Sequence, residues 1–322
     1  MPDDFPTRGL FCALSTPLDG DGRIHGDAFR AHAARLLAEG CDGIAPFGTT
    51  GEGPSFSAAE RKAGLEALLQ QGIATSRIVA GAGAAAASDA IDLGRHALSL
   101  GVTRLLMLPP FYFKDLTDEE LYGAYARIID GIGDARLRLV LYHIPQVTQV
   151  PLTQGAIARL RAGYKTIVAG IKDSTGDIDH TLRLIRRFPD IRVFCGAEQH
   201  LPAVLQAGGA GTICGLANLI PRRMRRLRDA KPDEAQALVP GIAMLAGAVC
   251  DGPFVPRLKA LLAVTAGDDW WRNACPPYLP LSAAETSALL RRVTGAGVLE
   301  EDWPSLLQPA AQKARQVLST RL

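Results

Sequence analysis

Eight short apolar runs, each bounded by glycine or proline, recur along the first two thirds of this chain and constrain its fold more than any other feature. Most of them are apolar throughout and do not alternate with polar residues, which is typical of strands buried on both faces of a parallel sheet. The runs lie at 9–17, 40–48, 77–83, 103–110, 137–145, 165–173, 191–197 and 209–218.

Helix-like segments separate these runs, and two of them begin with strong capping signals. "SAAE" at 57–60 predicts a capping box, and in "TDEE" at 117–120 a threonine cap precedes acids that suit the N-terminal dipole. The segments lie at 26–39, 57–71, 88–100, 118–131, 153–162, 177–188, 198–207 and 221–230. Strand and helix alternating eight times predict an α/β fold, a (β/α)8 TIM barrel.

A doubly wound open sheet is the alternative for such a pattern. It finds little support, because "GAGAAAA" at 81–87 lacks the G-x-G-x-x-G spacing of a dinucleotide site. Beyond about residue 230 only helix-like segments remain. We therefore expect a barrel over 1–230 and a C-terminal helical appendage over 231–322, packed on the barrel or on another subunit.

The charge balance argues against nucleic acid and membrane partners. Lys plus Arg number 35 against 33 Asp plus Glu, a net charge of +2, so no broad basic field exists. The basic cluster at 221–231 has the period of a solvated helix face and no interleaved aromatic residues. No apolar stretch of about 18 residues is present to span a bilayer, and the N-terminus lacks the pattern of a signal peptide.

The six cysteines show neither CxxC nor metal-like spacing, and several lie in apolar runs. They are Cys12, Cys41, Cys195, Cys214, Cys250 and Cys275. This pattern predicts reduced core thiols, no metal site and a cytoplasmic protein.

In a (β/α)8 barrel the chemistry lies at the carboxyl ends of the strands, where "FGTTGEG", "PPFYFK", "YHIP" and "IKDSTGD" all fall. Lys172 in the last of these motifs has two interpretations. A dry strand end disfavours the ammonium and leaves an amine that can form a Schiff base with a ketone. Alternatively, Lys172 forms a salt bridge with Asp173 or Asp177, and the spacing alone leaves both open. Lys165, before the same strand, carries no catalytic expectation.

Neighbouring strand ends carry groups that suit Schiff-base chemistry. Tyr142 closes the preceding strand, so its phenol could reach the amine and move protons. The loop from Gly48 offers the hydroxyls of Thr49 and Thr50, with backbone N–H groups that can hold a carboxylate. Taken alone, the sequence of this loop is more typical of a simple turn with a helix cap. Tyr112, which follows two prolines, is by itself more typical of an aromatic residue at the surface.

Four motifs together resemble those of one known superfamily. They are "GTTGE" at 48–52, "PPFYF" at 109–113, "YHIP" at 142–145 and "GIKDSTGD" at 170–177. In this order and spacing they resemble the dihydrodipicolinate synthase and N-acetylneuraminate lyase superfamily, the pyruvate-type class I aldolases. The resemblance extends from near residue 15 to at least residue 221.

The resemblance implies a role for each matching residue. Lys172 matches the lysine that forms the Schiff base, and Tyr142 matches the tyrosine that shuttles protons at the lysine-bound carbon. Gly48, Thr49 and Thr50 match the loop that binds the carboxylate of the 2-oxo acid, such as pyruvate. Thr49 also matches the relay partner of that tyrosine.

Two further residues and the assembly follow from the same resemblance. Tyr112 matches a tyrosine that reaches across a tight dimer interface into the neighbouring site. Ile213 matches a residue whose backbone lies near the bound keto acid. The resemblance also implies no metal or organic cofactor, and a homotetramer built as a dimer of dimers.

One departure from the family pattern bears on the substrate. Dihydrodipicolinate synthases carry an arginine after the proton-shuttle tyrosine that binds the carboxylate of aspartate semialdehyde, and Val147 stands there in this chain. His143 and Gln149 likewise replace the usual asparagine and glycine. Valine cannot provide a bidentate carboxylate clamp. The sequence therefore favours a lyase or aldolase that cleaves or forms the C3–C4 bond of a 4-hydroxy-2-oxo acid of the 2-oxo-3-deoxy sugar acid type, giving pyruvate plus an aldehyde.

Three alternatives remain at this level. The first is dihydrodipicolinate synthase, and the second is a Schiff-base dehydratase or hydratase-aldolase, for which the sequence shows no group to expel hydroxide. The third is a non-catalytic keto-acid-binding regulatory protein, which would have no need for a buried amine. Strand alternation turns His143 outward from Tyr142, so we do not expect it to be catalytic.

Overall fold

A computed structural model describes residues 9–294, together with 298 and 302. All eight predicted strands form, and all are parallel to their neighbours, which confirms the TIM barrel. The strands are β1 Gly9–Ala13, β2 Gly43–Ala45, β3 Ala80–Gly81, β4 Arg104–Met107, β5 Arg138–His143, β6 Val168–Asp173, β7 Arg192–Cys195 and β8 Gly211–Cys214.

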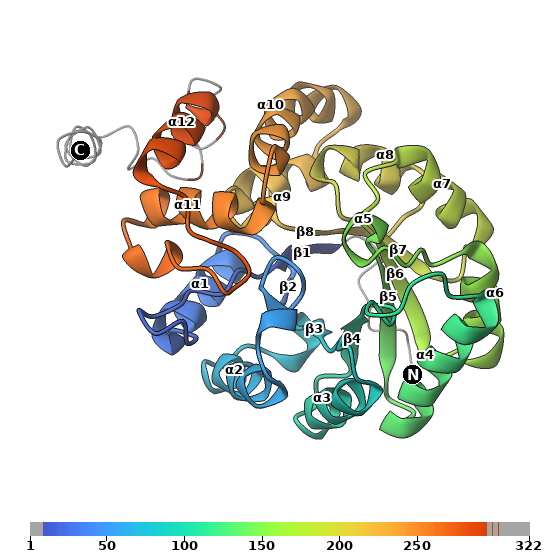
Figure 1. Cartoon of the computed structure of the whole chain (residues 1–322). Helices are drawn as coiled ribbons and strands as arrows, with labels where there is room; N and C mark the ends of the chain where they lie inside the picture. The colour runs from blue at the N-terminus through green and yellow to red at the C-terminus, as the bar shows by residue number, and fades with distance from the viewer. Residues whose placement is uncertain (1–8, 295–297, 299–301, 303–322) are drawn as a thin grey trace.

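The strands follow one another in the order β2-β1-β8-β7-β6-β5-β4-β3 around the barrel. A parallel bridge between Ile44 and Ile78 closes the ring beside β3, where the Val79 N–H donates to the Ile44 carbonyl over 2.9 Å. Figure 1 looks into this ring, with the helices arranged outside it. The carboxyl ends of all eight strands therefore meet at one face, as the predicted site requires.

The eight predicted barrel helices also form within the described residues. They are α1 Gly26–Ala38, α2 Ala58–Gln70, α3 Ala87–Ser99, α4 Asp118–Ile132, α6 Gln154–Gly163, α7 Ile178–Arg187, α8 Leu201–Gln206 and α9 Pro221–Asp229. The capping boxes predicted at Ser57 and Thr117 are both present, with Glu60 and Glu120 closing them. A short helix that the sequence did not predict, α5 (Pro145–Thr148), follows β5 in the loop that contains Val147.

Strand alternation divides the apolar side chains into two cores. Along β5, Val140 and Tyr142 belong to the cluster inside the barrel, whereas Leu139 and Leu141 pack outward against the helices. The inner cluster consists of Phe11, Ala13, Ala45, Val79, Leu106, Val140, Tyr142, Ile144, Ala169, Phe194, Ala210 and Ile213. Because these side chains fill the barrel, its interior is a packed apolar medium.

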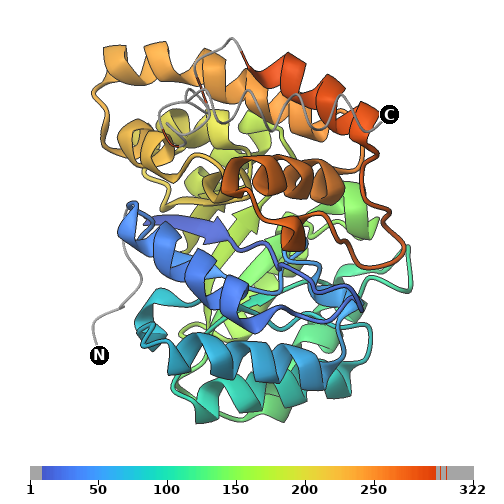
Figure 2. The same ribbon diagram turned by 90° about the vertical axis from the view of Figure 1, so that its left-hand side faces the viewer.

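Within the part of the chain that the structure describes, three further α-helices follow the barrel: α10 (Pro232–Cys250), α11 (Phe254–Ala266) and α12 (Ala283–Val293). Helix α10 contacts α9 and the 3-10 turn η3 (Glu198–His200), and Figures 1 and 2 show the three helices gathered on one side of the molecule. The division at residue 230 stays a prediction, and the last part of the predicted helical appendage, residues 303–322, lies outside the described residues.

Helices α10 and α11 also bear on the question of a membrane span. Within the described part of the chain, no single helix is long and apolar enough to cross a membrane. The two helices together reach that length and composition, but they are bent by 115° at the break between them.

The tight pairing of β8 with β1 gives a test of the barrel. Gly211 has φ +117°, and a Cβ there would lie 2.0 Å from the carbonyl oxygen of Gly9. We expect Gly211→Ala to lower the free energy of unfolding by about 3 kcal/mol or more, since strain and overlap add. Gly208 has φ +90° but open space around it, so Gly208→Ala should cost only about 1 kcal/mol. If urea unfolding showed equal losses of stability for the two variants, the close contact between Gly211 and Gly9 would not be important for the barrel.

Candidate active site

Lys172 lies near the carboxyl end of β6 and faces the barrel interior. It is 4% exposed and pairs in register with Tyr142 on β5 and Phe194 on β7. Its strand neighbours Ile171 and Asp173 face outward, so the dry surroundings of the amine come from adjacent strands more than from its own.

The amine of Lys172 and the ring of Tyr142 are in contact. Lys172 Nζ lies 4.3 Å from the centroid of the Tyr142 ring, and Tyr142 is 3% exposed. Within the described residues, no carboxylate lies within salt-bridge distance of this amine. The two residues that the sequence paired by strand position are therefore brought together.

Asp173 has partners other than Lys172. Its Oδ2 lies 2.9 Å from Nδ1 of His180 and accepts a hydrogen bond from the hydroxyl of Thr181 over 2.7 Å. Asp177 caps helix α7 by accepting from the N–H groups of residues 179 and 180. The salt-bridge interpretation of Lys172 is therefore wrong for both acids, because the carboxylate of each binds groups in the first turn of α7.

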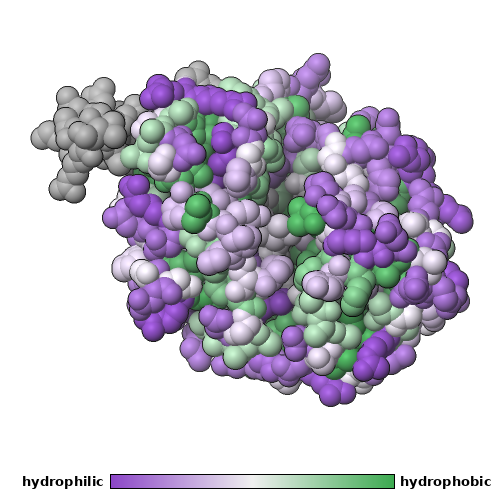
Figure 3. All heavy atoms as spheres, viewed as in Figure 1, coloured by the Kyte–Doolittle hydropathy of each residue, from purple (hydrophilic) through white to green (hydrophobic). Residues whose placement is uncertain are grey.

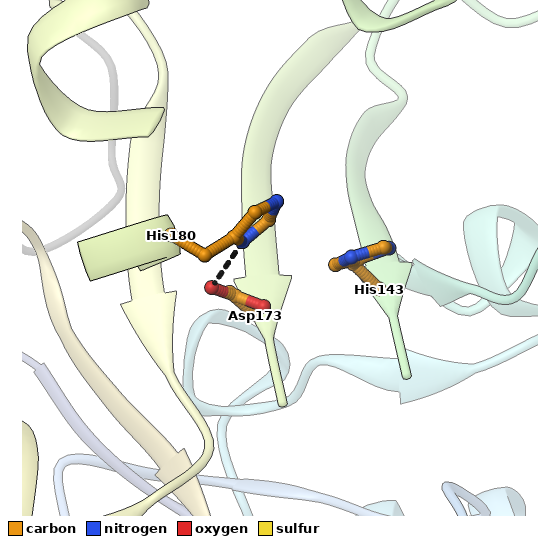
Figure 4. Close-up of side chains that lie close together, drawn as sticks. All are labelled: His143, Asp173 and His180. Carbon is orange, nitrogen blue, oxygen red and sulfur yellow. Dashed lines mark hydrogen bonds and ion pairs between the residues drawn. The ribbon is translucent and has the colours of Figure 1, made fainter. Parts of the chain in front are cut away.

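A compact cluster lies on the side of β5 and β6 that faces the helices; it consists of His143, Asp173 and His180 (Figure 4). His143 Nδ1 accepts the backbone N–H of Leu152 over 3.1 Å, which places the proton of the neutral ring on Nε2 and leaves no free lone pair for a metal ion. The two imidazole rings stack 5.0 Å apart at 27°, so their in-plane lone pairs do not converge on a common point. These residues fit a hydrogen-bonded network better than a metal centre.

The loop after β2 carries the predicted carboxylate-binding groups. Gly48 and Thr50 are buried, Thr49 is half-buried, and the loop continues into the 3-10 turn η1 (Gly53–Ser55). A Cβ placed on Gly215, after β8, would lie 3.5 Å from Thr50 Oγ1, so this loop meets the one that follows β8. Among the described residues no hydrogen bond joins Thr49 to Tyr142, and the predicted proton relay stays a prediction.

The two other predicted site residues lie in contrasting places. Ile213 on β8 is fully buried in the inner core and pairs in register with Phe11. Tyr112 is 73% exposed on the loop after β4, where its ring contacts Phe113 5.2 Å away. The structure therefore gathers Lys172, Tyr142 and Ile213 within one barrel and leaves Tyr112 at the surface.

One acidic residue at this face did not emerge from the sequence. Glu198 in η3 is buried, and its Oε1 accepts the backbone N–H of Leu216 over 2.8 Å. Burial raises the pKa of Glu198, while N–H donors and the charge of Lys172 oppose that shift. The sequence signal that could have identified Glu198 is its position directly after the apolar run at 191–197.

Comparison with known proteins identifies the family. The family model described as the dihydrodipicolinate synthetase family matches residues 6–295, nearly the whole chain. The chain belongs to this family. The resemblance inferred from four motifs is confirmed, and because dihydrodipicolinate synthetase family members are class I aldolases and lyases, the protein is an enzyme of that kind.

Relatives in the family carry different names. An uncharacterized DapA-like lyase of Chloroflexus aurantiacus is 37% identical over 294 residues, which is 88% of this chain and 94% of that protein. A 4-hydroxy-tetrahydrodipicolinate synthase of Acidiphilium cryptum is 31% identical, over 91% of this chain and 99% of its own.

Solved structures agree with the fold. Dihydrodipicolinate synthase from Agrobacterium tumefaciens superposes with a TM-score of 0.83 at 36% identity, covering 88% of this chain and 98% of its own. A variant of 2-keto-3-deoxygluconate aldolase from Sulfolobus solfataricus reaches a TM-score of 0.81 at 22% identity, covering 94% and 99%. The second likeness supports the fold alone.

The buried position of His143 predicts a pH-dependent stability. Burial lowers its pKa from 6.5 to about 4, so between these values the unfolded chain binds a proton that the native ring does not. The stabilising contribution is present above pH 6.5 and is lost as the pH falls toward 4, by about 2 kcal/mol between pH 7 and pH 5. We expect the free energy of unfolding of His143→Gln, measured with urea, to fall less than that of wild type between pH 7 and pH 5. Parallel losses in the two proteins would contradict this.

Proposed function

We propose that this enzyme forms a Schiff base through Lys172 and cleaves or forms the C3–C4 bond of a 4-hydroxy-2-oxo acid, giving pyruvate and an aldehyde. One observation carries the proposal: the amine of Lys172 is buried inside the barrel, 4.3 Å from the centroid of the Tyr142 ring. A buried amine beside a phenol and free of any ion pair among the described residues is suited to nucleophilic attack on a ketone.

The reaction follows from these groups. The amine attacks the C2 ketone, the carbinolamine loses water, and Tyr142 moves the protons. The resulting iminium draws the electrons of the C3–C4 bond as the C4 hydroxyl loses its proton, so an aldehyde leaves and an enamine remains on Lys172. Protonation at C3 and hydrolysis of the iminium then release pyruvate and the free amine.

Two other parts of the site support this sequence of steps. The substrate carboxylate would bind the hydroxyl and backbone groups of the loop that contains Gly48, Thr49 and Thr50, beside the backbone of Ile213. Glu198 is buried in η3 at the same face, and the charge of Lys172 opposes the rise in pKa that burial gives this carboxyl group.

We propose a 2-oxo-3-deoxy sugar acid as the substrate type. Val147 is 58% exposed on α5, at the position where synthases of the family carry an arginine for the second carboxylate. Dihydrodipicolinate synthase remains the second candidate, because the named relative from Acidiphilium cryptum is such an enzyme. A sugar-derived aldehyde presents hydroxyl groups and needs no carboxylate clamp, which favours the first candidate.

We also propose that the chain assembles as a homotetramer of two tight dimers. Apolar patches reach the surface on the face shown in Figure 3. Tyr112 and Phe113 on the loop after β4 are 73% and 70% exposed, and exposed aromatic residues of this kind are enriched in interfaces between proteins. Lys114 Nζ donates to the carbonyl of Thr148 over 2.8 Å, so this loop is attached to α5, which carries the exposed Val147.

Borohydride reduction in the presence of pyruvate tests the Schiff base directly. We expect one covalent pyruvate increment on wild-type protein, located on Lys172 by peptide mass spectrometry, and none on Lys172→Met. Lys165→Met is the matched control, because Lys165 is exposed and precedes the same strand. An adduct that persists in Lys172→Met would show that another amine reacts.

Tyr142→Phe separates proton transfer from binding. Loss of the phenol should slow imine formation about 100- to 10,000-fold, since general acid–base groups contribute that much. The pyruvate concentration for half-maximal trapping should stay close to that of wild type. An unchanged rate of trapping would remove Tyr142 from the mechanism.

A substrate panel tests the proposed specificity. We expect 2-oxo-3-deoxy sugar acids to release pyruvate faster than pyruvate condenses with aspartate semialdehyde, because no arginine lies at position 147. Val147→Arg should improve the use of aspartate semialdehyde relative to wild type. Faster condensation with aspartate semialdehyde in the wild-type enzyme would favour the synthase, and accumulation of dehydrated products would favour a dehydratase.

A further inference from the structure

Glu52 ends the "GTTGE" motif, and its carboxylate is buried although it lies in a loop. The backbone at Glu52 has φ +56°, a left-handed conformation that residues other than glycine seldom adopt. The side chain is fully inaccessible to solvent. A buried carboxylate without partners is strongly destabilising, so the groups that pair with Glu52 decide whether this loop can keep its shape.

Both partners of Glu52 come from the helical region that follows the barrel. Nζ of Lys259, on α11, lies 2.5 Å from Oε1, and the Lys259 side chain is 1% exposed. The backbone N–H of Cys275 donates to Oε2 over 2.6 Å. Burial lowers the pKa of Lys259, while the charge and the hydrogen bond of Glu52 oppose that shift. The acid of the motif is thus paired with groups 207 and 223 residues later in the chain.

The loop that Glu52 closes is tightly constrained. The N–H of Glu52 donates to the carbonyl of Thr49 over 3.1 Å, and Phe47 also has a positive φ, +59°. A Cβ on Gly53 would lie 1.9 Å from the carbonyl oxygen of Phe47. The backbone of Thr49 and Thr50 is therefore held between β2 on one side and the anchored carboxylate of Glu52 on the other.

We propose that Lys259 is a positioning residue for the site: its ion pair with Glu52 holds the Thr49–Thr50 loop in the shape that receives the 2-oxo acid carboxylate. This inference rests on the proposed function, in which that loop binds the substrate. Lys259 touches no substrate and acts through Glu52. Helix α11, outside the barrel, thereby helps to hold the binding loop in place.

Three variants of the full chain test this role. Lys259→Met removes the charge that pairs with Glu52, and the double variant Glu52→Gln with Lys259→Met removes both buried charges. Lys62→Met is the matched control, because Lys62 forms a surface ion pair with Asp92 over the same 2.5 Å. Each protein is measured for its Tm, for the pyruvate concentration that gives half-maximal borohydride trapping, and for amide hydrogen exchange over residues 47–53.

We expect Lys259→Met to raise the half-saturating pyruvate concentration by about 10- to 100-fold with maximal trapping unchanged, because a displaced binding loop weakens docking without removing the amine. Exchange over 47–53 should become faster, and Lys62→Met should change neither property. If Lys259→Met does not fold, the double variant decides, since neutral residues can often replace a buried pair without loss of stability.

Two outcomes would overturn the inference. One is a folded Lys259→Met or double variant with wild-type half-saturation and wild-type exchange over 47–53, which would mean that the ion pair serves stability alone. The other is a lower Tm with faster exchange throughout the barrel and no selective effect on that loop. Absence of a pyruvate adduct on the unmodified protein would contradict the proposed function instead, because amide exchange reports on the loop without any reaction.

Discussion

The parallel register between β5 and β6 is the constraint on which the site depends. Two consecutive pairs, Tyr142 with Lys172 and His143 with Asp173, lie at the ends of these strands. Because side chains alternate across a sheet, the first pair enters the barrel and the second faces the helices. The same few residues therefore supply the proposed reacting groups on one side of the sheet and the contacts of β6 with α7 on the other.

Two of the described lysines are buried, and their amines lie in different electrostatic surroundings: one is paired with a carboxylate and the other is not. Lys259 lies 2.5 Å from the carboxylate of Glu52, and its charge is stabilised by that contact. Lys172 is almost as buried, but its amine lies over the face of the Tyr142 ring, 4.3 Å from the ring centroid, and forms no ion pair with a described residue. A paired ammonium is a poor nucleophile, whereas an amine that lacks such a partner is free to react.

Much of the fold could be predicted because its signals are local. Continuous apolar runs and caps such as Ser57 depend on residues a few positions apart, and all eight strands were found from them. Lys172 and Tyr142 followed from the rule that places chemistry at strand ends. The partners of Asp173 required knowledge of side-chain direction in β6, which a strand with apolar residues on both faces does not reveal.

The groups that sequence reasoning missed are joined by long-range contacts. Nothing near Glu52 in the sequence indicates that Lys259 will meet it, since their contact depends on how α11 packs against the closed barrel. Glu198 was passed over for a similar reason, because its burial and its bond to Leu216 depend on the neighbouring loop after β8. Such contacts cannot be read from periodicity, because they join residues that are far apart in the chain.

The distance along the chain between Glu52 and its partners has a consequence for biosynthesis. Protein synthesis proceeds from the N-terminus, and early segments can fold while later ones are still being made. A nascent chain that has completed all eight strands still lacks Lys259 and Cys275, so the carboxylate of Glu52 has no counter-charge from α11 at that stage. The barrel can therefore close on the ribosome before the loop that ends at Glu52 is anchored, because both partners of Glu52 are translated later.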